Sequence, residues 1–350
     1  MKIIYMGTPD FAVEPLRRLV EAGKNIVAVV TMPDKPAGRG HKIQFSPIKE
    51  YALSVGLPIL QPVNLKDPEF IEELRSYQAD LQIVVAFRML PEIVWNMPPL
   101  GTFNLHASLL PQYRGAAPIN WAVINGETET GITTFFLQHE IDTGNIIMQE
   151  KITIAPDDNA GIVHDKLMML GADLVLKTVN QIESGNLTST PQDAIYCPPV
   201  LGGRAQQAEG VNNSLFSTQL KAAPKIFKET CRINFNTTAE SVRNLVRGLA
   251  PYPAAWIELT KNCSPELGEV VEDQRGMSET TNMKIYEVSK ELCTPSHPAG
   301  TLICDGKKIL KVAVQDGYIH LDQVQLAGKK RMPATDLMRG TDLTQYTIKQ

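Results

Sequence analysis

Short apolar runs separated by helical patterns begin at residue 2 and recur through the first quarter of the chain. They lie at 2–6 (KIIYM), 26–31 (IVAVVT), 58–60 and 81–87 (LQIVVAF). Nearly continuous apolar runs of this length, rich in Val and Ile, are typical of parallel strands that are buried on both faces. Helical patterns fill the intervals at 10–23, at 47–56 and from 67 onward. The sequence therefore predicts an open α/β domain with a Rossmann-like, mostly parallel sheet.

The second half of the chain changes character twice. Residues 130–154 predict two further strands and 158–184 a long helix, after which Pro, Gly, Asn and Gln interrupt every pattern. One helix at 237–249 and six short strand-like runs between 254 and 326 come next, which predicts a small OB-like β-barrel. We therefore expect a first domain at 1–186, a linker at 187–206 and a smaller barrel-like C-terminal domain at 207–350.

Several classes of protein are disfavoured by what the sequence lacks. The longest apolar runs are far shorter than the roughly 18–20 residues that cross a bilayer, so we expect no membrane partner. The five cysteines form no Cys-x-x-Cys pair, which argues against a disulfide framework or a thiolate zinc site and favours the cytoplasm. Only the first glycine of a dinucleotide fingerprint follows the first strand, at Gly7, and P-loop and His-Glu-x-x-His patterns are absent. We therefore expect no nucleotide cofactor and no metal.

Charge is distributed unevenly along the chain. The formal net charge is −4, yet residues 221–350 carry 18 Lys and Arg against 15 Asp and Glu, while residues 1–220 carry 16 against 23. Clustered cations bind phosphate whatever the overall balance. A polyanionic partner of the C-terminal part and an ordinary solvated surface both stay open.

An asparagine and a histidine share one face of a predicted strand. The run GTFNLH (101–106) predicts this strand, and alternation places Asn104 and His106 on the same side. The segment SLLPQYRG (108–115) follows directly, and Asp142 precedes a Thr-Gly turn further along the chain. Ligands of open α/β sheets bind beyond the carboxyl ends of the strands. The pattern is compatible with two interpretations. Either Asn104 and His106 belong to a ligand site at this edge, or His106 is a structural histidine and Asn104 forms a turn.

Five segments together resemble the family of bacterial methionyl-tRNA formyltransferases: GTPDFA, PDKPAGRG, NLHASLLPQYRGAAPIN, IDTG and PYPAAW. The pattern NxHxSLLPxxRG with a later Asp-x-Gly is similar to that of the wider 10-formyltetrahydrofolate transferase superfamily, which includes sugar-nucleotide formyltransferases. PDKPAGRG and RNLVRGLAPYPAAW narrow the resemblance to the tRNA enzymes. The resemblance runs over nearly the whole chain. It implies a formyltransferase fold for the first domain and tRNA binding for the barrel.

The resemblance also implies a reaction and its residues. A cytoplasmic monomer would transfer formyl from 10-formyltetrahydrofolate to the α-amino group of methionyl-initiator tRNA for translation initiation, without a metal. Such a transfer needs an oxyanion donor, a group with a pKa near neutral and an orienting carboxylate. The implied catalytic residues are Asn104, His106 and Asp142, and the implied folate-binding residues are Ser108, Leu109, Leu110 and Pro111. No covalent intermediate is required, which fits the absence of an activated Ser or Cys.

Two basic segments are candidates for tRNA contact. The 32–49 loop carries Lys35, Arg39 and Lys42, and we expect it to enter the acceptor stem beside the active centre. The segment AGKKRMP carries Lys329, Lys330 and Arg331, which either contact phosphates or occupy a solvated turn.

Two other functions stay open at this point. A sugar-nucleotide formyltransferase would use the same catalytic residues, and a non-catalytic tRNA-binding protein would keep only the architecture. The sequence also departs from the family pattern in three places. These are Phe87-Arg88-Met89-Leu90, where many members carry a glycine and one more residue, His139-Glu140-Ile141 before Asp142, and a longer stretch at 201–216.

Overall fold

The computed structural model describes residues 1–37, 42–195, 220–261 and 280–349. They form two compact units. Unit 1 comprises Met1–Pro118, Glu129–Thr153 and His164–Pro224, and unit 2 comprises Ile119–Thr128, Ile154–Val163 and Lys225–Gln350. The expected limits of the linker at 187–206 stay predictions, because residues 196–206 lie outside the described part of the chain.

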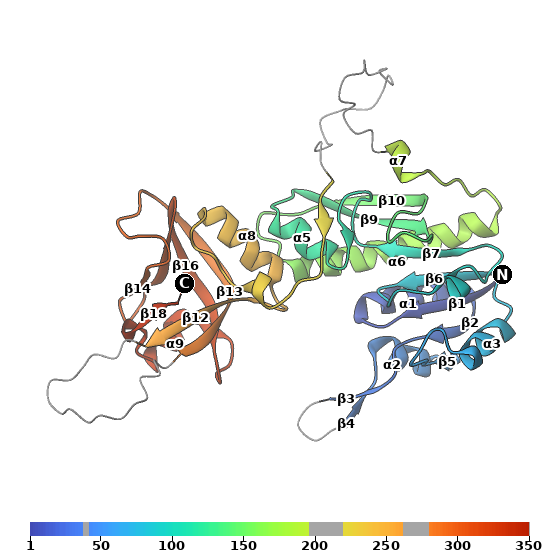
Figure 1. The fold of residues 1–350 in the computed structure, drawn as a ribbon, viewed down its shortest axis with the longest axis horizontal. Helices are drawn as coiled ribbons and strands as arrows, with labels where there is room; N and C mark the ends of the chain where they lie inside the picture. The colour runs from blue at the N-terminus through green and yellow to red at the C-terminus, as the bar shows by residue number, and fades with distance from the viewer. Residues whose placement is uncertain (38–41, 196–219, 262–279, 350) are drawn as a thin grey trace, which may run out of the picture. The chain divides into compact units, whose positions relative to one another are not determined.

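Unit 1 is built on a seven-stranded sheet, as far as its described residues show (Figure 1). The strand order is β10–β9–β7–β6–β1–β2–β5. The five strands from β7 to β5 run parallel, and β9 and β10 are antiparallel to their neighbours. The bounds are β1 Lys2–Gly7, β2 Asn25–Val30, β5 Ile59–Leu60, β6 Leu81–Val85, β7 Thr102–His106, β9 Glu129–Phe136 and β10 Ile146–Thr153. The expected open, mostly parallel α/β sheet is confirmed.

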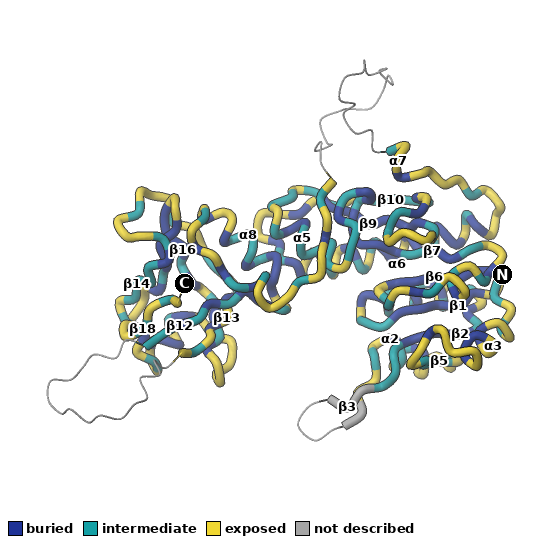
Figure 2. The backbone as a smooth tube through the Cα atoms, viewed as in Figure 1, coloured by how far each residue is buried: buried dark blue, intermediate teal, exposed yellow. Residues whose placement is uncertain are grey.

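Helices connect these strands or follow the last of them. The helical patterns at 10–23, 47–56, from 67 and at 158–184 each contain a helix, whereas the sequence did not predict the short helices at 92–95 and 192–195. Their bounds are η1 Asp10–Ala12, α1 Val13–Glu21, α2 Pro47–Ser54, α3 Pro68–Ser76, α4 Glu92–Trp95, α6 Ala160–Glu183 and α7 Gln192–Ile195. Local capping explains two of the starts, because the Ser46 and Asp67 side chains accept the backbone N–H groups of Lys49 and Glu69. The strands beneath the helices are mostly buried (Figure 2).

The carboxyl ends of four neighbouring parallel strands meet at one edge of this sheet. β1, β2, β6 and β7 end there, at Gly7, Val30, Val85 and His106. Unit 1 also contains two short β pairs: the hairpin of β3 (Lys35–Ala37) and β4 (Lys42–Gln44), and the pair of β8 (Arg114–Gly115) and β11 (Ala222–Ala223). The edge at which β1, β2, β6 and β7 end is the place where open α/β sheets bind ligands.

Unit 2 is a nearly closed antiparallel barrel, as expected. Its strand order is β14–β15–β16–β13–β12–β18, with β17 paired to β16. The strands are β12 Ala255–Lys261, β13 Thr280–Leu292, β14 Leu302–Cys304, β15 Leu310–Val314, β16 Gly317–Leu326, β17 Met332–Pro333 and β18 Tyr346–Ile348. The helices are α5 Pro118–Ile124, α8 Ala239–Leu249, α9 Ala334–Arg339, η2 Glu229–Cys231 and η3 Leu343–Gln345. The strand-like run at 268–273 lies outside the described residues.

Helix α8 supplies one wall of the barrel core. Val242, Val246 and Leu249 recur at helical spacing and are buried with Ile257 and Ile285 from the strands. The apolar stripe of the helix and the alternating inward residues of the strands therefore form one core. In the part of the chain that the structure describes, none of the helices has the length and apolar character of a membrane span.

Candidate active site

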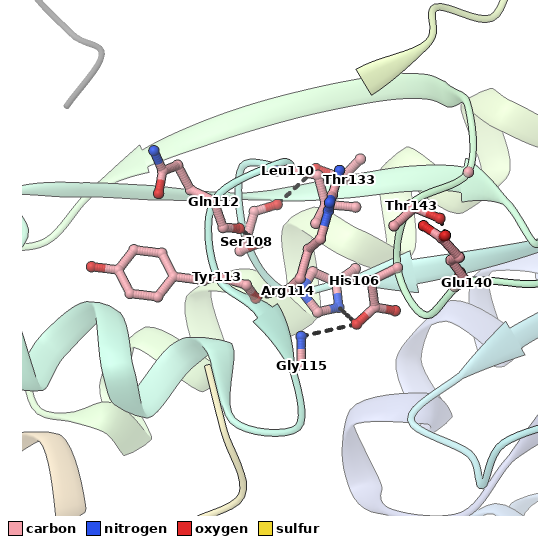
Figure 3. Close-up of polar contacts among 12 residues, drawn as sticks. His106, Ser108, Leu110, Gln112, Tyr113, Arg114, Gly115, Thr133, Glu140 and Thr143 are labelled. Carbon is pink, nitrogen blue, oxygen red and sulfur yellow. Dashed lines mark hydrogen bonds and ion pairs between the residues drawn. The ribbon is translucent and has the colours of Figure 1, made fainter. Parts of the chain in front are cut away.

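His106 is the last residue of β7 and is buried, with 6% of its surface exposed. Its Nε2 atom lies 2.9 Å from the backbone carbonyl oxygen of Tyr113 (Figure 3). A carbonyl oxygen only accepts hydrogen bonds, so Nε2 carries the proton and Nδ1 holds the lone pair of the neutral ring. The fold therefore fixes the tautomer of this histidine.

Burial and charge act on His106 in opposite directions. Burial lowers the pKa of His106 below its ordinary value and is the larger effect, while the Asp142 carboxylate and the Tyr113 carbonyl raise it. The net result is a lowered pKa, so the ring is neutral near pH 7. A proton taken up on Nδ1 would be stabilised by Asp142, whose Oδ2 atom lies 4.0 Å away.

Asp142 sits in the connection between β9 and β10 with a backbone φ of +56°. Its Oδ2 atom accepts the backbone N–H of Gly115 at 2.9 Å, which ties this turn to the loop after β7 (Figure 3). Gly144 follows two residues later, and a Cβ there would lie 1.6 Å from the carbonyl oxygen of Phe136. The Thr-Gly turn therefore requires a glycine to bring Asp142 beside His106.

Asn104 lies two residues before His106 on β7 and is half-buried. Its side chain makes no hydrogen bond to any residue that the structure describes. A partly exposed amide at this edge can donate a hydrogen bond to a ligand oxygen. Asn104 and His106 thus come from one strand, and Asp142 reaches His106 from a separate connection.

The loop of Ser108, Leu109, Leu110 and Pro111 packs tightly against β9 and β10. Ser108, Leu110 and Pro111 are buried, and Leu109 is half-buried. Thr133 donates to the Ser108 carbonyl at 2.7 Å and accepts the Leu110 N–H at 3.3 Å. Gln149 donates to the Leu110 carbonyl at 2.8 Å and to Thr133 Oγ1 at 2.9 Å. Thr133 and Gln149 therefore hold the backbone of this loop in one conformation, and of the four residues only Leu109 is partly exposed.

A segment distant in sequence also holds this loop. Strand β11 pairs in parallel with β8, and the Tyr113 N–H donates to the Lys221 carbonyl at 2.7 Å. Gly115 has a φ of +126°, and a Cβ there would lie 2.5 Å from the carbonyl oxygen of Ala223. Tyr113 and Gly115 supply the backbone groups that bind His106 and Asp142. Sequence reasoning missed these roles because no local pattern distinguishes such residues from an ordinary loop.

The candidate basic residues lie in different parts of the chain. Arg39 lies outside the described residues. Lys42 is the first residue of β4, next to the undescribed stretch, whereas Lys35 is the first residue of β3, at the end away from it. Lys329, Lys330 and Arg331 follow β16 in unit 2. There Lys329 donates to Thr341 Oγ1 at 2.6 Å, Arg331 pairs with Glu287 at 2.6 Å, and Lys330 is exposed.

The departure at Phe87-Arg88-Met89 has a structural role. Arg88 donates to the carbonyl oxygen of Val63 at 2.8 Å and to that of Pro62, and its guanidinium lies 5.6 Å from the centre of the Phe87 ring. The arginine therefore ties the loop after β6 to the loop after β5. The longer stretch at 201–216 lies outside the described residues.

Among the described residues, no three His, Cys, Asp or Glu side chains gather as a metal site would require.

Two family models match the chain, and the second match begins at residue 225, where the last stretch of unit 2 also begins. A model of the formyl transferase family matches residues 1–179, and a model of the formyl transferase C-terminal domain matches residues 225–342. The methionyl-tRNA formyltransferase of Bacteroides thetaiotaomicron is 57% identical over 344 residues, which are 98% of this chain and 97% of that protein.

Solved structures share the fold at low sequence identity. WlaRD, a sugar 3N-formyltransferase solved with dTDP and 5-N-formyltetrahydrofolate, matches with a TM-score of 0.59 at 18% identity, over 94% of this chain and 99% of that one. HypX from Aquifex aeolicus in complex with tetrahydrofolic acid matches with a TM-score of 0.57 at 16% identity. That match covers 97% of this chain and spans about half of HypX (47%). Both likenesses concern the fold.

Proposed function

Because the chain belongs to the methionyl-tRNA formyltransferase family, we propose that it formylates the α-amino group of methionine on initiator tRNA. The donor substrate is 10-formyltetrahydrofolate, which supplies the formyl group when bound. The product is the N-formylmethionyl-tRNA that begins translation. The observation that carries the proposal is the pairing of a buried, tautomer-fixed His106 with Asp142 at the ligand-binding edge of a sheet of this family.

Asn104 is the proposed donor to the oxygen on which negative charge builds during the transfer. Its amide is half-buried at the strand end and is not held by another described side chain or backbone group. A donor that meets charge as it develops stabilises the transition state more than the ground state, and this amide has its N–H groups available for that contact. Ser108, Leu109, Leu110 and Pro111 are the residues that would hold the donor, through the backbone and apolar surface of their loop.

His106 is the proposed proton carrier. Its lowered pKa leaves Nδ1 unprotonated near pH 7, so the ring can take the proton that the attacking amine loses. Asp142 stabilises the imidazolium that forms, from 4.0 Å away. His106 then returns the proton to the nitrogen that leaves, so the ring ends as it began. The proton and the formyl group are both accounted for in this reaction without an oxidant, a metal or a covalent enzyme intermediate.

The tRNA contacts are assigned by charge. Lys35, Arg39 and Lys42 would meet the acceptor end beside the donor site, while Lys329, Lys330 and Arg331 would bind phosphates further along the tRNA. We further propose that the protein acts in the cytoplasm, where cysteines without a disulfide framework stay reduced, and that it acts as a monomer.

The two alternative functions are less well supported. The sugar N-formyltransferase WlaRD shares 18% identity with this chain, against 57% for the methionyl-tRNA formyltransferase. A non-catalytic tRNA-binding protein has no need for the buried His106–Asp142 pair. The deciding experiment supplies the full chain with 10-formyltetrahydrofolate and either charged initiator tRNA or an amino-sugar nucleotide. We expect formyl-methionyl-tRNA in the first reaction. Formylation of the sugar nucleotide alone, or of neither acceptor, would refute the proposal.

A further inference from the structure

Gln192 is a buried glutamine whose amide is fully used. It lies at the start of α7 and 2% of its surface is exposed. Its Oε1 atom accepts Nε and Nη2 of Arg114, at 3.0 Å and 2.6 Å. Its Nε2 atom donates to the carbonyl oxygens of Asp142 and Gly144, both at 2.9 Å. An arginine only donates and a carbonyl oxygen only accepts, so these partners fix which way the amide points.

The four hydrogen bonds join two loops that meet beside His106. Arg114 precedes Gly115, whose N–H binds the Asp142 carboxylate, and Asp142 and Gly144 flank the turn that presents this carboxylate. The φ of +56° at Asp142 belongs to a region that non-glycine residues populate sparsely. Such a conformation persists when surrounding contacts hold it. Gln192 supplies two of those contacts.

The segment that carries Gln192 is itself anchored on the sheet. Thr190 and Ile146 exchange two backbone hydrogen bonds of 2.8 Å. Ile195 packs against a buried cluster of Leu110, Phe135 and Ile146. Gln192 therefore stands between two attachments to the same unit, and its amide is a fixed support for the turn. Well-placed catalytic groups depend on supporting residues that are themselves locked by packing and hydrogen bonds.

We propose that Gln192 is a positioning residue for formyl transfer: its amide holds the Asp142 turn against the Arg114–Gly115 loop and so sets the Asp142 carboxylate beside His106. Gln192 does not touch the reacting groups. The inference deepens the proposed function and rests on it. A misplacement of a catalytic group by about 1 Å can cost on the order of a hundredfold in rate. Loss of the amide should therefore reduce turnover through Asp142.

The test is a double-mutant cycle in the full-length protein. Gln192→Met keeps the size of the side chain and removes its polar atoms, while Gln192→Glu keeps acceptors for Arg114 and removes both donors. We expect each to lower kcat about tenfold or more in the wild-type background. In the Asp142→Asn background the same changes should lower kcat less than twofold, because the residue through which Gln192 acts is already disabled.

Gln82→Met is the matched control. Gln82 is a fully buried glutamine on β6, hydrogen-bonded to Thr102, and lies in the strand away from the His106 edge. The change removes this hydrogen bond together with a buried amide nitrogen that has no partner among the described residues, and we expect it to leave kcat within twofold of wild type. Three results would overturn the positioning role. The first is a Gln192 effect equally large in both backgrounds, and the second is a kcat of the Gln192 variants within twofold of wild type. The third is loss of folded protein in both Gln192 variants while Gln82→Met folds.

A second measurement needs no substrate. The titration of His106 is followed by NMR, its signal assigned by its loss in His106→Gln. Since Asp142 raises the pKa of His106, Gln192→Met should lower that pKa, in the same direction as Asp142→Asn. An unchanged titration would contradict the positioning role even if kcat fell. If the wild-type protein itself formed no formyl-methionyl-tRNA, the proposed function would fail. The titration would still show whether Gln192 positions Asp142 beside His106.

Discussion

The edge of the sheet around His106 and the basic turn of Lys329, Lys330 and Arg331 are organised in contrasting ways. Around His106 the polar groups are buried or half-buried, and separate parts of the chain hold them. The basic turn is exposed, and the partners of Lys329 and Arg331 are surface side chains. Proton transfer requires fixed geometry away from water, whereas binding to a phosphate backbone tolerates flexible cations. Substitutions at the two regions should therefore affect different kinetic parameters.

The largest effect should come from removing either member of the buried pair. His106→Ala and Asp142→Asn should each lower kcat at least about a hundredfold, the lower end of what general acid–base groups contribute. Circular dichroism and thermal melting should show that both variants still fold. Near wild-type turnover of either variant at saturating donor and tRNA would show that its residue has no catalytic role.

A pair of glycines tests how rigid the two regions are. Gly144→Ala places a Cβ 1.6 Å from a backbone oxygen, so the Asp142 turn must move, and we expect kcat to fall about tenfold or more. Gly328→Ala, beside the basic turn, meets no atom within 4 Å and bears only the strain of its φ of +79°. That strain costs roughly 1–2 kcal/mol of unfolding free energy and should leave kcat unchanged. Equal kcat values for the two variants would remove the contrast between the regions.

Arg39 tests whether the 32–49 loop takes part in formyl transfer at the His106 edge. Arg39→Ala should reduce transfer to charged initiator tRNA about tenfold, since a charge-assisted contact contributes roughly 1.5–3 kcal/mol. It should also lower the slope of log affinity against log salt by about one unit. Arg75→Ala, at an exposed arginine of α3 paired with Glu72, is the control and should change neither. If Arg39→Ala kept the wild-type rate and salt dependence, the loop would be a solvated connection without a role in tRNA binding. A sugar-nucleotide acceptor would then be favoured.

The basic turn of unit 2 should affect binding alone. Replacing Lys329, Lys330 and Arg331 together with glutamine should weaken tRNA binding about threefold to tenfold and flatten its salt dependence, with kcat at saturation unchanged. Filter binding and steady-state kinetics at several salt concentrations measure both quantities. A fall in kcat at saturating tRNA would contradict a role limited to positioning the RNA.

The smallest effect is a shift in pH dependence. Transfer requires neutral His106, so activity is present above the pKa of His106 and is lost as the pH falls through it. Asp142 raises this pKa against the larger lowering effect of burial. Asp142→Asn should therefore move the acid limb of the kcat profile to lower pH, alongside its loss of rate. The profile from pH 5 to 8 gives the measurement, and a shift toward higher pH would contradict the assigned tautomer and proton path.

The fold was predictable because its signals are local. Continuous apolar runs marked the parallel strands of unit 1, and short strand-like runs marked the barrel of unit 2. The start of helix α2 was visible in Pro47, because proline favours the first position of a helix. Asn104 and His106 could be placed on one strand face because alternation along a strand is also a local pattern. Their roles came from the family pattern rather than from periodicity.

The support of the site was not predictable, because its parts are distant in sequence. The stretch around Gln192 contains Pro, Ser and Thr and was interpreted as a linker, yet Gln192 lies on the Asp142 turn, 50 residues away. Residues 222–223 pair with β8 across a separation that no local pattern records. Arg88, a departure from the family pattern, donates to carbonyl oxygens of a neighbouring loop. Such contacts form only when the strands are assembled.

By itself the sequence determined the alternation of strands and helices, the barrel that follows, and the presence of an amide, an imidazole and a carboxylate suited to formyl transfer. The strands, helices and barrel follow from hydrophobic periodicity, which is a property of short segments, and the three side chains were singled out by the family pattern and fit the reaction by their chemistry. Tertiary structure alone decided that Nε2 of His106 is protonated, that its pKa is lowered, and that Asp142 lies beside Nδ1. The physical reason is that desolvation and hydrogen-bond geometry depend on groups that the chain brings together only when it folds.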